Sequence, residues 1–362
     1  MLQYPRSNIS SENVYVEIPS AYLQKVNNDT IDHEFDTNVA IETSFIEDIQ
    51  ASLLAVSQFI QKGIKEQKSG EFHLAMKSLK DALSLLKLIG NREKQPQVLA
   101  LLGLVAYSMG DYENTIDYCQ QCLLLVKEYP EQKIEMQALS CLGNAYRHLD
   151  EYDKAINYLN QDLQITQHLQ DQRGQVAALN NLGLVYRACG NFTGAIQYYL
   201  QSLIILQALQ DKWGEEKVLK NLGNAYYAIE NYPQAIAYYE RFVILARSLN
   251  NHRAASQVLK NLGNACYALG DYLKAIQYYQ ERLQLAREIG DKQSEEQSLN
   301  TLGVAHEAIG EYNQAIAYYE QQLILAQSIQ DSRSIAKALA SLRVTCIALG
   351  DYAKAMQYEQ HD

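Results

Sequence analysis

A glycine recurs every forty residues through most of this chain. The segments around these glycines repeat as well, as in Asn221-Leu-Gly-Asn-Ala-Tyr-Tyr227, and the glycines themselves are Gly63, Gly103, Gly143, Gly183, Gly223, Gly263 and Gly303. Arg343 occupies the next position of the register. Self-similarity with a period of roughly 20–50 residues is typical of solenoids, in which each unit packs only on its neighbours. We therefore expect an array of similar units rather than one globular core.

Each unit is predicted to contain two helices. Around Gly223, apolar residues follow one another at spacings of three and four and define one face of a first helix, with Asp211 as its N-cap: Val218, Leu219, Leu222, Ala225, Tyr226 and Ile229. A second apolar face, in the second helix, consists of Ala235, Ile236, Tyr239, Val243 and Ala246. Gly223 itself is predicted to lie where the second helix crosses the first at close range.

The turn between the two helices carries its own signal. Five units have a glycine at the position of Glu230, where it suits the left-handed residue that ends a helix: Gly110, Gly190, Gly270, Gly310 and Gly350. The following residue is Asp, Asn or Glu, and Asp and Asn are good N-caps for the second helix. Each unit is therefore predicted to be a helical hairpin.

The chain resembles the tetratricopeptide repeat family. The family's pattern of Leu, Gly, Tyr, Ala and an aromatic residue occurs here as Leu222, Gly223, Tyr226, Ala235 and Tyr239, and again around Gly263. The unit is longer than the usual 34 residues, as in Pins-type adaptors and many bacterial repeat proteins. The resemblance covers roughly residues 45–362 and implies an all-α, right-handed superhelical solenoid of about eight hairpins, with the last one truncated.

The family resemblance also implies a binding surface. In such arrays the first helices line a concave groove through positions 2, 5, 9 and 12 of each unit, with the repeat glycine at position 8. Applied to this chain, that frame predicts a peptide-binding set made of Asn144, Arg147, Asn180, Arg187, Lys217, Lys220, Asn224, Tyr227, Lys260, Asn264 and Tyr267. The same frame places Gln137, Ser140, Ala177, Leu184, Gln257, Gln297, Asn300, Val304 and Glu307 on this surface.

The predicted groove residues suit an extended acidic or C-terminal peptide segment. Asparagine can pair with a peptide backbone through both donors and an acceptor, Lys and Arg can meet a carboxylate, and Tyr227 and Tyr267 offer flat apolar contacts. The alternative is that these residues only keep an exposed face soluble. A complete carboxylate clamp of the chaperone-binding type is not expected, because Gln297 and Thr301 stand where it needs Lys and Arg.

Composition excludes several classes of protein. The formal net charge of −11 argues against nucleic-acid binding, which needs a basic surface. No apolar run approaches the length of a membrane span, and residues 1–6 lack the apolar core of a secretory signal. We expect a cytoplasmic protein.

No pattern for catalysis, cofactor or metal binding stands out from the repeat. Cys119 and Cys122 form a C-x-x-C, but Cys119 takes the position of Tyr199 and Tyr239 in other units, so both are expected to be core residues without a metal. Acidic pairs such as Glu215-Glu216 recur near the start of the first helix, where they complement the helix dipole. The chain is therefore not expected to be an enzyme.

The two ends differ from the repeats. Residues 1–43 hold seven acids against two bases without periodicity, so we expect a disordered acidic arm that folds onto the groove and competes with a partner. The solenoid is expected over residues 44–362, starting with a helix at Ser44. No polar capping helix is expected after the eighth unit, which leaves three explanations open: self-association through the C-terminal end, docking of a partner there, or truncation from a longer protein.

Three functions remain open on the sequence. The first is an adaptor or scaffold that binds an extended segment of a protein partner in the groove. The second is a sensor that closes around a short signalling peptide, and the third is a structural assembly factor for a larger complex.

Overall fold

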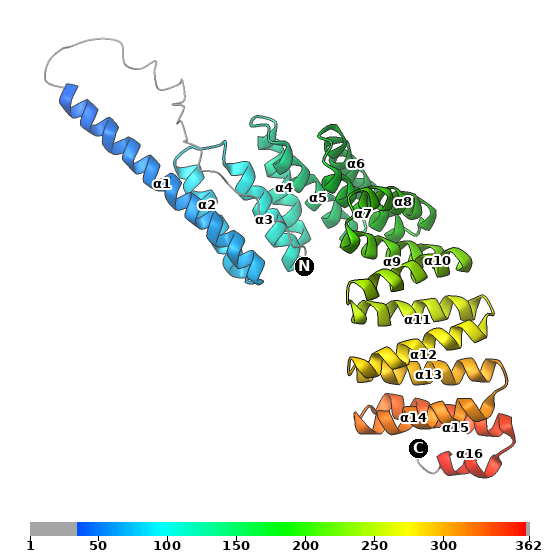
Figure 1. Cartoon of the computed structure of the whole chain (residues 1–362). Helices are drawn as coiled ribbons and strands as arrows, with labels where there is room; N and C mark the ends of the chain where they lie inside the picture. The colour runs from blue at the N-terminus through cyan, green and yellow to red at the C-terminus, as the bar shows by residue number, and fades with distance from the viewer. Residues whose placement is uncertain (1–34, 360–362) are drawn as a thin grey trace. The chain divides into compact units, whose positions relative to one another are not determined.

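The structure is a computed structural model that describes residues 35–359, with side chains from residue 49 onward. Within these residues the chain is all α-helical (Figure 1). Sixteen helices follow one another: α1 Phe35–Ser69, α2 Phe72–Leu88, α3 Gln95–Met109, α4 Tyr112–Val126, α5 Gln132–His148, α6 Tyr152–His168, α7 Gln172–Ala188, α8 Phe192–Ala208, α9 Lys212–Ala228, α10 Tyr232–Ser248, α11 His252–Ala268, α12 Tyr272–Glu288, α13 Lys292–Ala308, α14 Tyr312–Ser328, α15 Ser332–Leu349 and α16 Tyr352–Glu359.

The helices pair in sequence order into eight hairpins, which we number from hairpin 1 (α1 and α2) to hairpin 8 (α15 and α16). From α2 onward each described helix packs on the next. Several successive first helices also touch one another, namely α3 with α5, α5 with α7, α11 with α13 and α13 with α15, and the second helices show no comparable contacts among the described hairpins. The first helices are therefore the more closely spaced set, as expected for the inner side of a repeat array.

The start of the first helix differs from the prediction. Helix α1 begins at Phe35, before Ser44, so residues 35–43 are helical where an arm was expected. The chain divides into two units, 1–55 and 56–362, and the second contains α2 to α16. Residues 1–34, which carry most of the predicted acidic arm, lie outside the described residues, and so does the predicted competition with a partner.

The repeat glycines are required by close helix contact, as predicted. A Cβ atom added to Gly223 would lie within 3.0 Å of ring atoms of Tyr239 on α10. The same overlap with a tyrosine ring occurs at Gly183, Gly263 and Gly303. In hairpin 2 the residue facing the glycine is Cys119, which is fully buried and takes the tyrosine position as predicted.

The turns also follow the predicted chemistry. Gly110 and Gly270 adopt left-handed φ angles of 79° and 85°, and the same conformation is imposed on Glu230, at 59°. The Asp211 side chain accepts a hydrogen bond from the Gly214 amide at 2.9 Å and so caps α9. Glu311, at the equivalent place before α14, makes no such side-chain cap. The sequence thus predicted both the hairpins and most of their ends.

One position of the second helix is buried in successive hairpins yet changes in chemistry. Its occupants, forty residues apart, are Ala82, Cys122, Asp162, Ser202, Phe242, Arg282 and Gln322, and all are at most 4% exposed. Arg282 donates through Nη2 to Gln297 of the next hairpin at 3.0 Å. We call this set the junction position, because it lies where a hairpin meets its neighbours.

Candidate binding face of the first helices

The predicted peptide-binding residues lie on four consecutive first helices, α5, α7, α9 and α11. We call the surface formed by positions 2, 5, 9 and 12 of the first helices the A face. All eleven predicted residues are at least partly exposed there, and the most open are Lys217 and Tyr227. Because each position repeats at the same register of stacked hairpins, side chains of one position form rows along the array.

The asparagines of position 9 are held by tyrosine hydroxyls, a link that the sequence did not reveal. The Tyr239 hydroxyl donates to Oδ1 of Asn224 at 2.7 Å, and the Tyr279 hydroxyl donates to Oδ1 of Asn264 at 2.7 Å. Asn261 of the next hairpin donates a further bond to Asn224 Oδ1 at 3.3 Å. The carbonyl oxygens are therefore engaged within the protein, and the amide N–H groups remain as the donors that a ligand could use.

Asn144 differs from these two. Its amide donates to the Ser140 carbonyl one turn earlier on α5 at 2.9 Å, and the second helix of its hairpin has Leu159 where the others have tyrosine. A paired tyrosine fifteen residues downstream is thus the sequence signal that separates Asn224 and Asn264 from Asn144.

The cations of the A face are not engaged in ion pairs with the described residues. Arg147, Arg187, Lys217, Lys220 and Lys260 form no ion pair within 4.0 Å with any described residue. The acid that acts on Lys217 and Lys220 is Glu216, which is buried and accepts a 2.7 Å hydrogen bond from Asn251. Burial raises the pKa of the Glu216 carboxyl. This face of an acidic protein therefore carries five cations that form no ion pair with a described residue.

Position 12 changes in character along the array. Arg147 and Arg187 are followed by Tyr227 and Tyr267, and then by Glu307. The rings of Tyr227 and Tyr267 meet Tyr232 and Tyr272 edge to face, with centroids 5.4 and 5.0 Å apart, so their orientation is fixed.

Glu307 ends the cationic part of the face. Its carboxylate accepts hydrogen bonds from the Tyr319 hydroxyl at 2.9 Å and from Thr345 of the next hairpin. Glu307 is therefore the hydrogen-bond acceptor for the Tyr319 hydroxyl, as Asn224 is for the Tyr239 hydroxyl.

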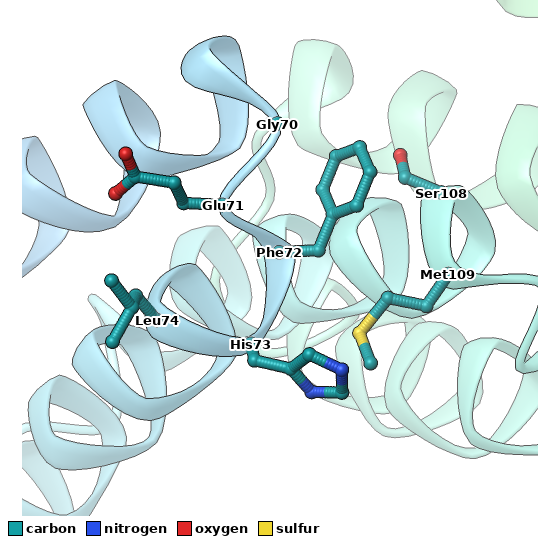
Figure 2. Close-up of a pocket in the computed structure, with 7 residues that line it drawn as sticks. All are labelled: Gly70, Glu71, Phe72, His73, Leu74, Ser108 and Met109. Atoms are coloured by element: carbon teal, nitrogen blue, oxygen red, sulfur yellow. The ribbon is translucent and has the colours of Figure 1, made fainter.

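A depression of about 640 Å³ lies elsewhere, at the turn between α1 and α2 (Figure 2). It is open to solvent, and no predicted site residue lines it; its lining consists of Gly70, Glu71, Phe72, His73, Leu74, Ser108 and Met109. The Glu71 carboxylate points away from the His73 ring, so the two do not form a proton-transfer pair (Figure 2).

Neither a metal-ligand cluster nor a membrane-spanning helix occurs among the described residues. No group of three His, Cys, Asp or Glu side chains within them gathers as metal ligands. None of the helices described combines the length and apolar character needed to cross a bilayer.

Comparison with protein families gave matches over most of the repeats. Sequence patterns of the tetratricopeptide repeat family match residues 94–168, 174–242 and 214–288, and a further pattern of that family matches residues 298–332. No curated protein matches significantly.

Several solved structures are similar in fold. A signal-transduction ATPase with a tetratricopeptide repeat sensor from Pyrococcus horikoshii matches with a TM-score of 0.61 and 16% identity, over 94% of this chain and 54% of that one. This chain therefore spans about half the length of that protein. The apo form of RapI matches with a TM-score of 0.53 and 16% identity, over 76% of this chain and 99% of that one. Aspartyl phosphate phosphatase F from Bacillus subtilis matches with a TM-score of 0.55 and 16% identity, over 80% of this chain and 75% of that one.

Proposed function

Because the chain belongs to the tetratricopeptide repeat family, we propose that it is a non-enzymatic adaptor or scaffold that binds an extended, acidic segment of another protein along its A face. The family typically binds protein or peptide partners, and the scaffold alone does not identify the partner. The identification of the binding surface therefore depends on the side chains of this chain.

The observation that carries the proposal is the state of the A-face donors. The amide groups of Asn224 and Asn264 are oriented by the tyrosine hydroxyls behind them and can donate to the carbonyl groups of an extended backbone. The same bonds satisfy the hydroxyls of two buried tyrosines, and they leave the asparagine amide groups as the donors on a partly exposed face. Pre-oriented donors lose less entropy when a ligand binds, which favours affinity.

The charge on the same face supports an acidic ligand. Lys220 and Lys260 lie one hairpin apart at position 5, and neither forms an ion pair with a described residue. Opposite charge speeds association and weakens with added salt. We therefore expect binding that is strongest at low ionic strength.

A second candidate is a sensor of a short signalling peptide. It is favoured by the fold likeness to the ATPase whose repeat domain is described as a sensor, and the same A face would hold the peptide. The two candidates differ in the ligand, a segment of a larger protein or a free peptide.

The test is affinity capture from a native lysate with three forms of the full chain. The first is wild type, the second is Lys220→Glu with Lys260→Glu, and the third is Lys77→Glu with Lys80→Glu, which makes the same charge change at exposed positions of α2. We expect a partner that is retained by the control variant and lost from the A-face variant, and fractionation of bound material by size separates proteins from peptides. Equal capture by all three forms would contradict the proposal and move the site off the A face.

A further inference from the structure

The second helices of hairpins 5, 6 and 7 each place a tyrosine hydroxyl against an acceptor on the A face. Tyr239 donates to Asn224, Tyr279 to Asn264 and Tyr319 to Glu307, at 2.7, 2.7 and 2.9 Å. In all three hairpins the ring lies over the repeat glycine and carries the hydroxyl beyond it. The molecule thus supplies an acceptor at this place in three consecutive hairpins.

Hairpin 4 breaks this rule. Tyr199 lies over Gly183 in the same way and is fully buried, but its hydroxyl has no hydrogen-bond partner among the described residues. Leu184 stands where hairpins 5 and 6 have asparagine, and Arg187 stands where hairpin 7 has Glu307. A buried hydroxyl without an acceptor is costly, so its persistence in a repeated framework points to an acceptor that comes from outside the chain.

The electrostatic field of two cations reaches this hydroxyl. Arg187 and Arg147 are the charged groups that act on Tyr199, and both oppose the rise in its pKa that burial causes. Nε of Arg147 is itself buried without a partner, and so is Oδ1 of Asn180 on the same helix as Arg187. Hairpin 4 therefore supplies a donor hydroxyl, the Arg187 guanidinium and a free carbonyl oxygen, and Arg147 of hairpin 3 adds a second guanidinium.

We propose that Tyr199, Arg147 and Arg187 form a subsite for one carboxylate of the ligand. The Tyr199 hydroxyl donates to one carboxylate oxygen, as Tyr319 donates to Glu307, and the guanidinium groups neutralise the charge. Oδ1 of Asn180 accepts the N–H group next to that carboxylate. The inference rests on the proposed function of the A face and adds a fixed anchor to it.

A carboxylate fits because every free group except Asn180 Oδ1 is a donor or a positive charge. A neutral acceptor would leave two cations uncompensated, and a cationic ligand would be repelled. The carboxylate can come from the C-terminus of a peptide or from an Asp or Glu side chain. Since the Tyr199 hydroxyl is fully buried in the structure, the side chains that cover it must move aside when the carboxylate enters.

The probe is a pool of random twelve-residue peptides with free C-termini, selected on the full wild-type chain. The dissociation constant of the best binder is measured by fluorescence anisotropy as the free acid, as the C-terminal amide, and with each Asp or Glu changed to its amide. We expect one of these changes to weaken binding about tenfold or more, and its position tells which source supplies the carboxylate.

Two substitutions test the subsite in the protein. Tyr199→Phe removes only the hydroxyl, and Leu184→Asn supplies the internal acceptor that hairpins 5 and 6 already have. Both are expected to weaken the free carboxylate form about tenfold and to leave the amide form unchanged, while Tyr198→Phe and Arg241→Gln, which change the second helices outside the A face, leave both forms unchanged. Both variants should melt at or above the wild-type temperature, because no internal hydrogen bond is lost.

The outcomes distinguish failure of the carboxylate subsite from failure of the proposed A-face function. If peptides bind and Lys220→Glu with Lys260→Glu abolishes binding, but no carboxylate change and neither substitution matters, the subsite is wrong and the A-face function stands. If no peptide in the pool binds the wild-type chain, both are overturned.

Discussion

At the scale of single residues, Asp162 is the least expected group of the junction position. The carboxyl is 4% exposed, and burial together with the nearby Asp171 raises its pKa from 3.8 to about 7. Asp171 is held as the N-cap of α7 by the amides of Arg173 and Gly174, so it stays in place. Asp162 is therefore protonated in a large fraction of the folded molecules at neutral pH.

Asp162 gives the folded state a specific pH dependence. Because its folded pKa lies above the unfolded one, its contribution is most favourable below about pH 4 and is lost as the pH rises through about 7. Asp162→Asn should therefore stabilise the protein at pH 8 by up to about 4 kcal/mol, with the difference shrinking toward pH 5. Urea unfolding of both forms at several pH values measures this. Asp153→Asn, an exposed change on the same helix, should show no such trend, and a pH-independent difference for Asp162→Asn would contradict the assignment.

At the scale of the helical hairpin, the turn residue Glu230 bears a conformation that suits glycine. Its φ of 59° lies in the left-handed region. The glycines at the same place in other hairpins lie in that region too, with φ angles of 78–87°: Gly110, Gly190, Gly270, Gly310 and Gly350. A side chain in this region costs about 1–2 kcal/mol, part of which glycine loses again through its greater freedom in the unfolded chain.

Replacing this residue should stabilise hairpin 5. We expect Glu230→Gly to raise the free energy of unfolding by about 0.5–1 kcal/mol. Glu230→Ala is the matched control, because alanine removes the charge but keeps Cβ. A gain from alanine equal to that from glycine would show that the charge, and not the backbone, is responsible. Thermal melting of the three forms decides between them.

The hairpins could be predicted well because their signals are local. The close approach at Gly223 and the cap at Asp211 depend on neighbours within one unit, and the register repeats them often enough to be recognised. The contacts of the A face depend on hydrogen bonds between helices, such as that of Tyr239 with Asn224, which the sequence pattern does not reveal. The start of α1 at Phe35 was missed because the residues before Ser44 carry no repeat.

At the scale of the whole array, the eleven A-face residues were predicted from the register, but their states were not. Burial and hydrogen bonding separate them. Asn224 offers only its amide group, Asn144 is bonded to its own helix, and Arg147 and Arg187 act electrostatically on the unpaired hydroxyl of Tyr199. These differences depend on which residue of a second helix packs behind each A-face residue. They can be recognised only when the packing of the helices is known.

The junction position has a consequence for how the hairpins can be rearranged. Deleting residues 291–330 removes one whole period, but by register it would bring buried Arg282 opposite Lys337 in place of Gln297. Lys337 is exposed, so the cost comes from Arg282, which would stay buried and lose its hydrogen bond to Gln297. Leaving a buried charged group without this partner costs about 1–3 kcal/mol or more, so we expect this shortened chain to be clearly less stable. Deleting residues 211–250 would instead bring Ser202 opposite Gln257, with no buried charge, and should leave a folded chain. Circular dichroism and urea unfolding of both products test this.

If the two deletions were equally tolerated, the junction position would have no part in ordering the array. The expected difference means that hairpins with matching surfaces are still not interchangeable. The buried residue at each junction then determines which hairpin can follow it. A repeat protein of this kind can gain or lose a unit only where the newly joined hairpins have compatible side chains at the junction position.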